Sequence, residues 1–191
     1  MSKIVWGGGA LLAPVPPALV TCGTMTRPGV LTIAWTGTLN TIPPKTYISV
    51  RPERFSYDLI REQGEFVINL PTADLVRAVD LCGVKSGRDV DKFALAGLTP
   101  GESAKVACPL ILECPLALEC RVTDRVELGS HHMFLADIVA VDVEDRLVDS
   151  RGKLHLDRAG LLAYAHGEYF ALGKKLGSFG YSVRRKPRKK K

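Results

Sequence analysis

The stretches Leu116–Val122 (LALECRV) and His131–Val143 (HHMFLADIVAVDV) decide the fold class of this chain. In the first stretch, leucine, leucine, cysteine and valine occupy every second position, and alanine, glutamate and arginine stand between them. In the second stretch, five apolar residues fall on one face, namely Met133, Leu135, Val139, Val141 and Val143. Side chains of a β-strand alternate between its two faces, so this period of two predicts half-buried antiparallel strands. Gly129-Ser130 lies near the turn between them.

Shorter β-rich runs precede this pair of strands. They are Leu19–Cys22, Val30–Trp35, Thr46–Val50 and Phe66–Leu70. Turn-forming residues separate the runs, among them Arg27-Pro28-Gly29 and Ile42-Pro43-Pro44. Residues 1 to about 18 are broken by glycines and prolines and predict an extended segment. The segment Leu161–Ser182 predicts a final strand and a wrapping arm.

Two helices are expected between the strands. The first runs from Ser56 to about Gln63, with Ser56 as N-cap and Gly64 as the residue that ends it. The second runs from about Thr72 to Cys82, with Leu75, Val76 and Val79 on one side and Gly83 after its end. Many short strands, few helices and no alternation of strand and helix predict a mainly-β barrel with helical insertions.

The size and composition fit one intracellular domain. The length of 191 residues is enough for a core of its own. No apolar run approaches the roughly 20 residues needed to cross a bilayer, and the glycines and prolines of the first 20 residues make a poor signal peptide. The five cysteines are odd in number and form no CxxC pair, which favours buried, reduced thiols. We therefore predict a cytoplasmic protein that makes no contact with a membrane.

The positive charge is concentrated at the C-terminal end. Residues 184–191 contain seven Lys and Arg residues, and subtracting these from the formal charge of +6 leaves the remainder of the chain at −1. We therefore divide the chain into a domain of residues 1–183 and a basic, disordered tail of residues 184–191. A basic tail can contact an acidic partner. The body shows no basic stripe interleaved with aromatic residues, which argues against nucleic-acid binding.

The common catalytic motifs are absent from the sequence. No GxGxxG follows a predicted strand, and neither GxSxG nor HExxH occurs. His131 and His132 are adjacent on a predicted strand, so their side chains point to opposite faces and do not readily bind one metal together. Nucleophilic catalysis and metal catalysis therefore have little support, and no metal ligand is predicted.

Three other segments combine residue types suited to a phosphorylated, flat ligand. In Ser49–Ser56 a strand leads into a helix start flanked by two arginines, a favourable place for phosphate, although a capped helix with surface ion pairs has the same pattern. The strand Leu31–Thr38 ends in small and hydroxyl residues around one Trp, which fits the polar edge of a heterocycle or an ordinary core strand. The polar loop Cys82–Phe93 suits either a functional loop or a solvated connection.

Together these segments resemble the flavin reductase-like family, whose fold is the FMN-binding split barrel, and within it the flavoredoxin-type branch. The resemblance covers residues 14 to 180, and its motifs occur in order. They are LTIAWTG at Leu31–Gly37, SVRPERFSYDLI at Ser49–Ile60, GEFVINLP at Gly64–Pro71, CGVKSGRDVDKF at Cys82–Phe93 followed by AGLTP, and LECRV at Leu118–Val122 leading to GSHHMF at Gly129–Phe134.

The resemblance implies noncovalent FMN at the interface of a homodimer. Thr32, Ala34, Trp35 and Thr36 would face the isoalloxazine ring, partly through backbone groups. The ribityl phosphate would be surrounded by Ser49, Arg51, Arg54 and Ser56, and the long loop would close the site with Ser86, Gly87 and Lys92. His131 matches a histidine that the reductase members carry as GDH. Here Ser130 replaces the aspartate of that triplet, which leaves open whether His131 is catalytic and places nicotinamide.

The implied function is an FMN-binding oxidoreductase. In a flavin reductase, hydride passes from nicotinamide of NAD(P)H to the flavin, and a cation such as Lys92 near the ring would favour the reduced anion. The alternatives are an FMN-containing electron carrier that exchanges electrons with a redox protein such as ferredoxin, and a non-catalytic binding module.

Overall fold

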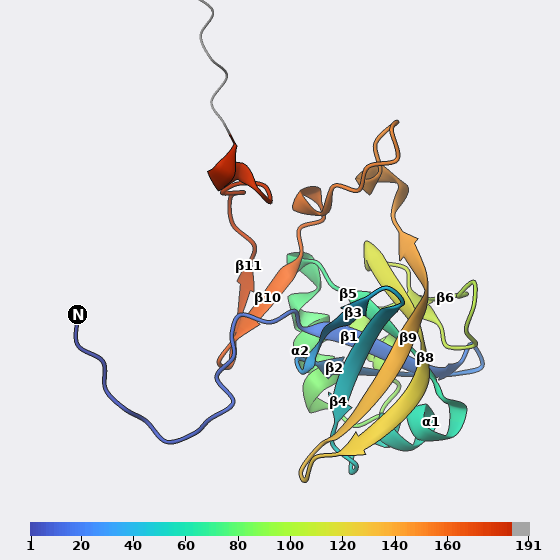
Figure 1. Ribbon diagram of the computed structural model, residues 1–191. Coiled ribbons are helices and arrows are strands. Elements are labelled where there is room, and N and C mark those ends of the chain that lie inside the picture. The colour runs from blue at the N-terminus through green and yellow to red at the C-terminus, as the bar shows by residue number, and fades with distance from the viewer. Residues whose placement is uncertain (185–191) are drawn as a thin grey trace, which may run out of the picture.

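The computed structural model describes residues 1–184, and its centre is one seven-stranded antiparallel sheet (Figure 1). The strands follow one another across the sheet in the order β2-β1-β5-β8-β9-β4-β3. Their bounds are β1 Ala18–Thr24, β2 Arg27–Ile33, β3 Thr36–Thr41, β4 Pro44–Val50, β5 Glu65–Leu70, β8 Leu116–Glu127 and β9 His132–Val143. Two small ribbons lie outside this sheet: β6 Pro100–Gly101 pairs with β7 Leu110–Ile111, and β10 Leu162–Ala165 pairs with β11 Glu168–Ala171.

The sheet curves into a barrel that is open along one line. Its two edge strands, β2 and β3, are consecutive in the chain and are joined only by Ala34 and Trp35. The chain therefore passes directly from one edge of the sheet to the other, and the backbone N–H of Ser49 donates to the carbonyl oxygen of Trp35 at 2.9 Å. We call this line, where the end of β2 meets β4, the seam. A mainly-β split barrel with helical insertions, as predicted, is the observed architecture.

Short helices cover the ends and one side of the barrel. The α-helices are α1 Phe55–Gln63, α2 Val76–Val84 and α3 Lys92–Ala96, and the 3-10 turns are η1 Ala73–Leu75, η2 Asp145–Leu147, η3 Leu156–Arg158 and η4 Tyr181–Val183. Both α1 and α2 contact β1 and β2, so they position the chain on either side of the seam. Among residues 1–184 there is no helix with the length and apolar character needed to cross a membrane.

Both faces of β9 carry apolar residues, and only one of them faces the barrel interior. The predicted face of Met133 and Leu135 is only half-buried, whereas Phe134 and Ala136 on the opposite face are buried in the main core. Apolar residues occupy both faces of this strand, so its periodicity does not distinguish inside from outside. Ile138, two residues beyond Ala136, packs against the same core by the same alternation.

Both helices begin at other residues than predicted, and α2 also ends later, whereas α1 ends where predicted. The N-cap of α1 is Arg54, and Ser56 is a buried residue of the first turn and not a cap. Gly64 does end α1, with a left-handed φ of 69°. The α2 helix starts later than predicted and continues through Gly83, where an added Cβ would lie 3.4 Å from Cβ of Thr32. Gly83 therefore allows α2 to pack closely on β2 instead of ending the helix.

Other boundaries also differ from the prediction. The strand predicted over Val30–Trp35 ends at Ile33, because the chain bends at the seam and continues as the unpredicted β3. The predicted loop Cys82–Phe93 begins inside α2 and ends in the unpredicted α3. Likewise, Leu161–Ser182 was predicted as one final strand and a wrapping arm, and it forms the β10–β11 hairpin followed by a segment with one 3-10 turn.

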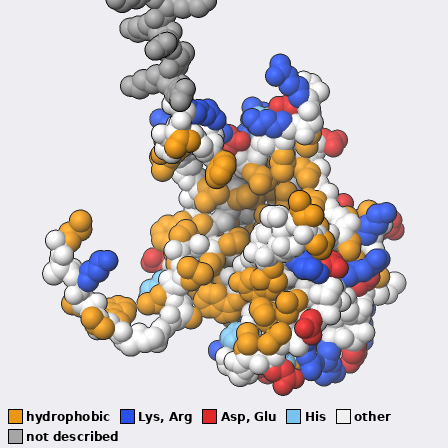
Figure 2. Space-filling model, in the orientation of Figure 1, with side chains coloured by type: hydrophobic (Ala, Val, Ile, Leu, Met, Phe, Trp, Pro, Cys, Tyr) orange, Lys and Arg blue, Asp and Glu red, His pale blue; other side chains and the backbone are white. Residues whose placement is uncertain are grey.

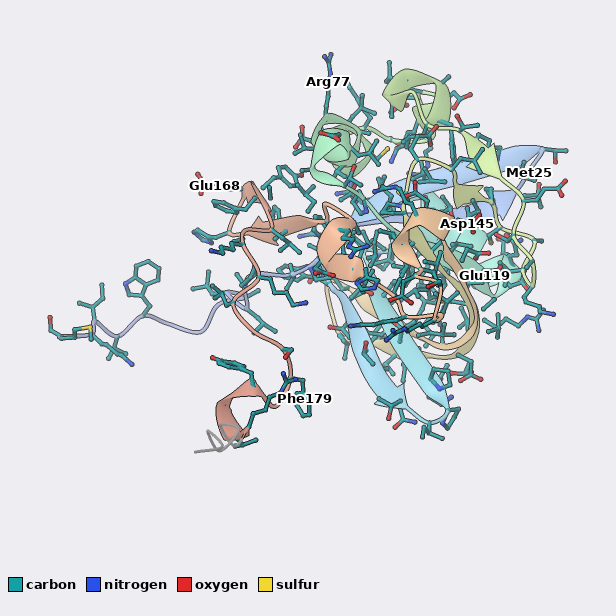
Figure 3. All side chains as sticks on the ribbon, turned by 90° about the horizontal axis from the view of Figure 1, so that it is seen from above. Met25, Arg77, Glu119, Asp145, Glu168 and Phe179 are labelled. Atoms are coloured by element: carbon teal, nitrogen blue, oxygen red, sulfur yellow. The ribbon has the colours of Figure 1, made fainter. Side chains whose placement is uncertain are left out.

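The two ends of the described chain form arms on the side of the β10–β11 hairpin (Figure 1). The N-terminal arm, residues 1–14, is extended, and Val15 bridges to Tyr164 of the hairpin. The C-terminal arm, residues 172–184, follows β11 and lies apart from the barrel, as Phe179 shows (Figure 3). Apart from Arg184, the predicted basic tail lies outside the described residues.

Candidate functional site

Two adjoining cavities lie along the seam and beside the start of α1. The seam cavity has a volume of about 230 Å³, and the basic cavity has one of about 420 Å³. The seam cavity is lined by Leu31, Thr32, Ile33, Ala34, Trp35, Ser49, Val50, Arg51, Arg54 and His131. The basic cavity is lined by Leu31, Arg51, Glu53, Arg54, Phe55, Ser56, Lys85, Ser86, Gly87, Arg88 and Lys92. Both share Leu31, Arg51 and Arg54, so they form one continuous groove.

The seam cavity presents backbone groups beside an aromatic ring. Because β2 is an edge strand that pairs only with β1, the second row of its backbone N–H and C=O groups is not used by the sheet. The hydroxyl of Thr32 donates to the carbonyl oxygen of Val79 in α2, which fixes that side chain. Trp35 occupies the bend between β2 and β3. This arrangement suits a flat ligand with donors and acceptors along its edge.

The basic cavity surrounds an uncapped helix start. No side chain caps the N-terminus of α1 at Arg54, so the first backbone N–H groups of this nine-residue helix have no side-chain acceptor. Five cationic side chains line the same cavity, namely Arg51, Arg54, Lys85, Arg88 and Lys92. Glu53 is the one carboxylate in the lining, and it forms an exposed ion pair with Arg51 at 3.3 Å. Helix amides and guanidinium groups together favour an anion such as phosphate.

Backbone acceptors hold the loop after α2 against the start of α1. Arg54 donates to the carbonyl oxygen of Gly83 at 3.1 Å, and Arg88 donates to that of Glu53 at 3.0 Å. An added Cβ at Gly87 would lie 2.6 Å from a ring carbon of Phe55. Only glycine therefore fits at position 87 without movement of the neighbouring ring.

Lys92 brings a buried ammonium group to the basic cavity. Its side chain donates to the carbonyl oxygen of Cys82 at 2.7 Å, and the residue is 8% exposed. Burial lowers the pKa of Lys92, an effect that the neighbouring Cys82 thiol partly opposes. An ammonium has three donors, so further N–H groups are available for a ligand. Lys92 lines the basic cavity and not the seam cavity, and its effect on a bound ring stays a prediction.

His131 lines the seam cavity, while its neighbour points elsewhere. Nδ1 of His131 lies 3.0 Å from the hydroxyl of Ser130. Partial burial and the positive charge of Arg51 lower the pKa of His131, so its imidazole is neutral at pH 7. Nδ1 of His132 instead lies 2.6 Å from the hydroxyl of Tyr57. The opposite orientations predicted for the two histidines are observed.

Most of the residues singled out from the sequence come together in this groove. The seam cavity contains Thr32, Ala34, Trp35, Ser49, Arg51, Arg54 and His131, and the basic cavity contains Arg51, Arg54, Ser56, Ser86, Gly87 and Lys92. Ser49 lies in the seam cavity and not in the basic cavity where a phosphate was expected. Thr36 lines neither cavity, and its hydroxyl donates to the carbonyl oxygen of Tyr47 at 2.6 Å.

Sequence reasoning missed five lining residues of the basic cavity. They are Leu31, Glu53, Phe55, Lys85 and Arg88. Lys85 and Arg88 belong to the polar loop that was noted for its cationic groups, so their charge was a usable signal. Glu53 and Phe55 gave no such signal, because their place depends on how Arg88 packs against the start of α1.

Cys22, whose thiol contacts Ser56 of the basic cavity, is unreactive. Cys22 is fully buried in the main core, and burial raises its pKa to about 11. All five cysteines are free thiols, and four of them are buried. Cys22 therefore stays protonated at neutral pH.

Comparisons with known proteins agree with this fold and with these motifs. The profile of the family described as "Flavin reductase like domain" matches residues 11–173. An uncharacterized protein of Archaeoglobus fulgidus is 36% identical over 140 residues, which cover 73% of this chain and 78% of that protein.

Two solved structures are similar over nearly the whole chain. The flavoredoxin of Desulfovibrio vulgaris (Miyazaki F) has a TM-score of 0.88 and 30% identity, and the match covers 96% of this chain and 100% of the other. A flavoredoxin from Methanosarcina acetivorans has a TM-score of 0.83 and 28% identity, with the same coverage. The chain therefore belongs to the flavin reductase-like family, in its flavoredoxin-type branch.

Proposed function

We propose that this protein binds FMN noncovalently in the groove of the seam and basic cavities and acts as an oxidoreductase of the flavin reductase type. The observation that carries this proposal is that the two ends of the groove differ in chemical character. Cations and uncapped helix amides lie at one end, and an edge strand with Trp35 lies at the other. FMN has the same order of parts, a phosphate joined by a sugar chain to a flat ring.

The residues of the groove fit each part of this ligand. Arg51, Arg54 and Lys92 would hold the phosphate together with the amides at the start of α1. Backbone groups of Thr32 and Ala34 would meet the polar edge of the ring beside Trp35. Ser49 and Thr36 remain predicted contacts, although Thr36 lines neither cavity and its hydroxyl proton is donated to Tyr47.

The chemistry divides between the cofactor and the chain. Bound FMN supplies the capacity to accept a hydride or electrons and to pass them on. The chain binds the phosphate, orients the ring at the edge of β2 and presents the neutral imidazole of His131 at the seam. We propose that His131 helps to place the nicotinamide of NAD(P)H against this ring.

A second candidate function is electron transfer between FMN and a redox protein such as ferredoxin, without significant NAD(P)H activity. The similarity to two flavoredoxins over 96% of this chain favours it. Both candidate functions use the same groove and differ in the electron donor, which is NAD(P)H in the first and a redox protein in the second.

An anaerobic absorbance spectrum of the purified, FMN-loaded protein, followed by addition of NADH and then NADPH, tests both candidates. Flavin bands that bleach rapidly with either nucleotide support the reductase. Bands that bleach only with dithionite or a reduced partner protein support the electron carrier. Absence of bound flavin after incubation with FMN and desalting would contradict both and would favour a binding module of another kind.

We further propose a cytoplasmic homodimer. Five free thiols are typical of a reducing compartment. Large apolar side chains are exposed along both arms, including Val5, Leu12, Leu176 and Phe179. Figure 2 shows this apolar surface on the arms and on the face of the molecule between them. A second copy of the chain would bury it.

A further inference from the structure

A hydrogen-bonded group of side chains joins α1 to the turn end of the β8–β9 hairpin, and the proposed function does not use it. The hydroxyl of Tyr57 lies 2.6 Å from Nδ1 of His132. Nη1 of Arg125 donates to the same hydroxyl at 3.2 Å, and Nη2 of Arg125 donates to the carboxylate of Glu127 at 3.1 Å. Tyr57 is 4% exposed and packs in the main core, so the group crosses from the helix to the hairpin beside apolar side chains.

The chemistry of Arg125 fixes the direction of these hydrogen bonds. A guanidinium has donors and no acceptor, so the Tyr57 oxygen accepts from Arg125. The phenol proton is then directed to Nδ1 of His132. The rings of Tyr57 and His132 also pack edge to face, with centroids 5.4 Å apart and an angle of 74° between their planes. A hydrogen bond and a ring contact together therefore set the orientation of the His132 side chain.

His131 lies directly before β9 and depends on its surroundings for its place in the seam cavity. The ladder between β4 and β9 begins with the pair Val50 and His132, so His131 lies outside it. The carbonyl oxygen of His131 accepts the backbone N–H of Leu128 at 3.0 Å, and its ring lies against the hydroxyl of Ser130. Both of these contacts belong to the hairpin turn itself. The side chain of His132 ties this turn to a different element, α1.

The same helix carries the phosphate end of the groove. Tyr57 lies in the first turn of α1, where its backbone N–H donates to the carbonyl oxygen of Arg54 at 3.0 Å. The preceding residue, Ser56, is buried and lines the basic cavity. The hydrogen bond between Tyr57 and His132 therefore joins the helix start to the turn that places His131 in the seam cavity.

We propose that Tyr57 and His132 are positioning residues that hold His131 in the seam cavity at a fixed place relative to the start of α1. This inference rests on the proposed function, in which His131 helps to place the nicotinamide against a ring whose phosphate is bound at α1. Tyr57 and His132 both lie outside the lining of the seam and basic cavities, so they act through His131 and not on the ligand. A displacement of about 1 Å is enough to slow a reaction that depends on orientation.

Four substitutions separate positioning from a general loss of stability. Two are disrupting variants: Tyr57→Phe removes the hydroxyl and keeps the ring, and His132→Leu removes the acceptor. The rescue variant is His132→Asn, whose amide oxygen is attached to the same carbon as Nδ1 in histidine. The matched control is Tyr169→Phe, because the hydroxyl of Tyr169 donates to Asp80 of α2 at 3.3 Å and this tyrosine also lies outside the lining of both cavities.

The first measurement is an NMR titration of His131 in the flavin-free full chain, with its signal assigned by its loss in His131→Asn. Partial burial and then the charges of Arg51 and Arg54 lower the pKa of this imidazole, and the charge of Glu53 opposes them. We expect both disrupting variants to move the pKa toward the ordinary value of about 6.5, because the ring leaves these surroundings. The rescue variant and the control should keep the wild-type pKa. A general loss of stability would not alter the titration of the folded protein.

The second measurement is the rate at which NAD(P)H bleaches the flavin of the FMN-loaded protein. Tyr57→Phe should lower this rate about fivefold in the wild-type chain and by less than about twofold in the His131→Asn chain, because its effect passes through His131. FMN affinity should change by less than about twofold, since the phosphate contacts remain.

An unchanged pKa of His131 in both disrupting variants, or equal losses of rate with and without His131, would overturn the inference and leave the proposed function intact. Absence of FMN binding, or of bleaching by NAD(P)H, would instead contradict the proposed reductase. The titration needs no flavin, so in that case a shifted pKa would still support the positioning and an unshifted one would overturn it.

Discussion

Arg51 is the residue whose substitution isolates the phosphate end of the groove. Its guanidinium lines both the seam and basic cavities and forms an exposed ion pair with Glu53, so the fold depends little on it. We expect Arg51→Gln to weaken FMN binding by about tenfold or more, the effect of one lost hydrogen bond to a charged group. Fluorescence titration with FMN and with riboflavin measures this.

The control for Arg51→Gln is Arg77→Gln, because Arg77 projects from the surface of α2 (Figure 3) and lines neither cavity of the groove. Riboflavin has no phosphate, so its affinity should be almost the same in both variants. Equal losses for riboflavin and FMN would show that Arg51 does not act on the phosphate.

His131 gives a prediction with a defined pH dependence. Because its pKa is lowered, the imidazole is neutral at pH 7 and gains a proton only at pH values below the ordinary value near 6.5. The rate of flavin bleaching by NAD(P)H should therefore be level between about pH 7 and 8 and should change in acid. We expect His131→Asn to reduce this rate about tenfold and to leave FMN affinity unchanged, as stopped-flow absorbance and titration would measure. An unaltered rate in the variant removes His131 from the reaction.

The α1 helix depends on its final residue for a clean end. Gly64 has a φ of 69°, its backbone N–H donates to the carbonyl oxygen of Ile60, and an added Cβ would meet no atom within 4 Å. Gly64→Ala should therefore lower the free energy of unfolding by about 1 kcal/mol through backbone conformation alone. Gly64→Asn should have a smaller effect, since asparagine tolerates this conformation. Urea unfolding of the two variants measures both losses in the free energy of unfolding. Equal losses for alanine and asparagine would point to a steric cause.

A buried carboxylate on β8 holds the loop that covers the outside of the sheet. Glu119 is fully buried and accepts hydrogen bonds from the backbone N–H groups of Ala104, Lys105 and Val106 at 2.6–2.9 Å. Asp142 on β9 lies beside it, and its Oδ2 is buried without a hydrogen-bond partner within residues 1–184. Burial, and then the charge of Glu119, raise the pKa of Asp142.

The raised pKa of Asp142 has a consequence for stability. The folded state holds its proton to a higher pH than the unfolded state, so the free energy of unfolding falls as pH rises through the window above about 3.8. Asp142→Asn removes this charge and should raise the melting temperature at pH 7 by about 2 °C or more. The gain should shrink as the pH is lowered toward 4. Melting curves across this range measure it, and a gain that does not vary with pH would exclude the electrostatic explanation.

The exposed apolar residues of the two arms lead to a prediction about the oligomeric state. Trp6 on the N-terminal arm and Phe179 on the C-terminal arm are 68% and 106% exposed in the single chain. If these arms pack on a second copy, light scattering should give twice the mass of the 20.8 kDa chain. Trp6→Ser combined with Phe179→Ser should shift the protein toward the monomer. The control Leu112→Ser replaces an exposed apolar residue of the loop after β7 and should not do so. A wild-type mass of one chain would contradict the dimer.

The amino-acid sequence by itself determined the class of the fold and the chemistry of the groove. Alternation along residues 116–143 predicts the long hairpin, and Ile42-Pro43 forms the predicted turn between β3 and β4, because these features depend on local geometry. Arg27-Pro28-Gly29, predicted as a turn, instead lies in β2, where it pairs with β1. The ordered motifs, and the arginines and Lys92 within them, identified the family and most of the groove. Such signals are readable because they depend on residue type and on spacing along the chain.

The tertiary structure alone decided which residues share a surface. Both faces of β9 are apolar, and only closure of the barrel selects Phe134 and Ala136 for the interior. The seam exists because the chain bends at Trp35 and brings β2 beside β4, and Arg88 joins the groove through its contact with Glu53, 35 residues away. These arrangements depend on contacts between distant segments, which no local pattern of residues encodes.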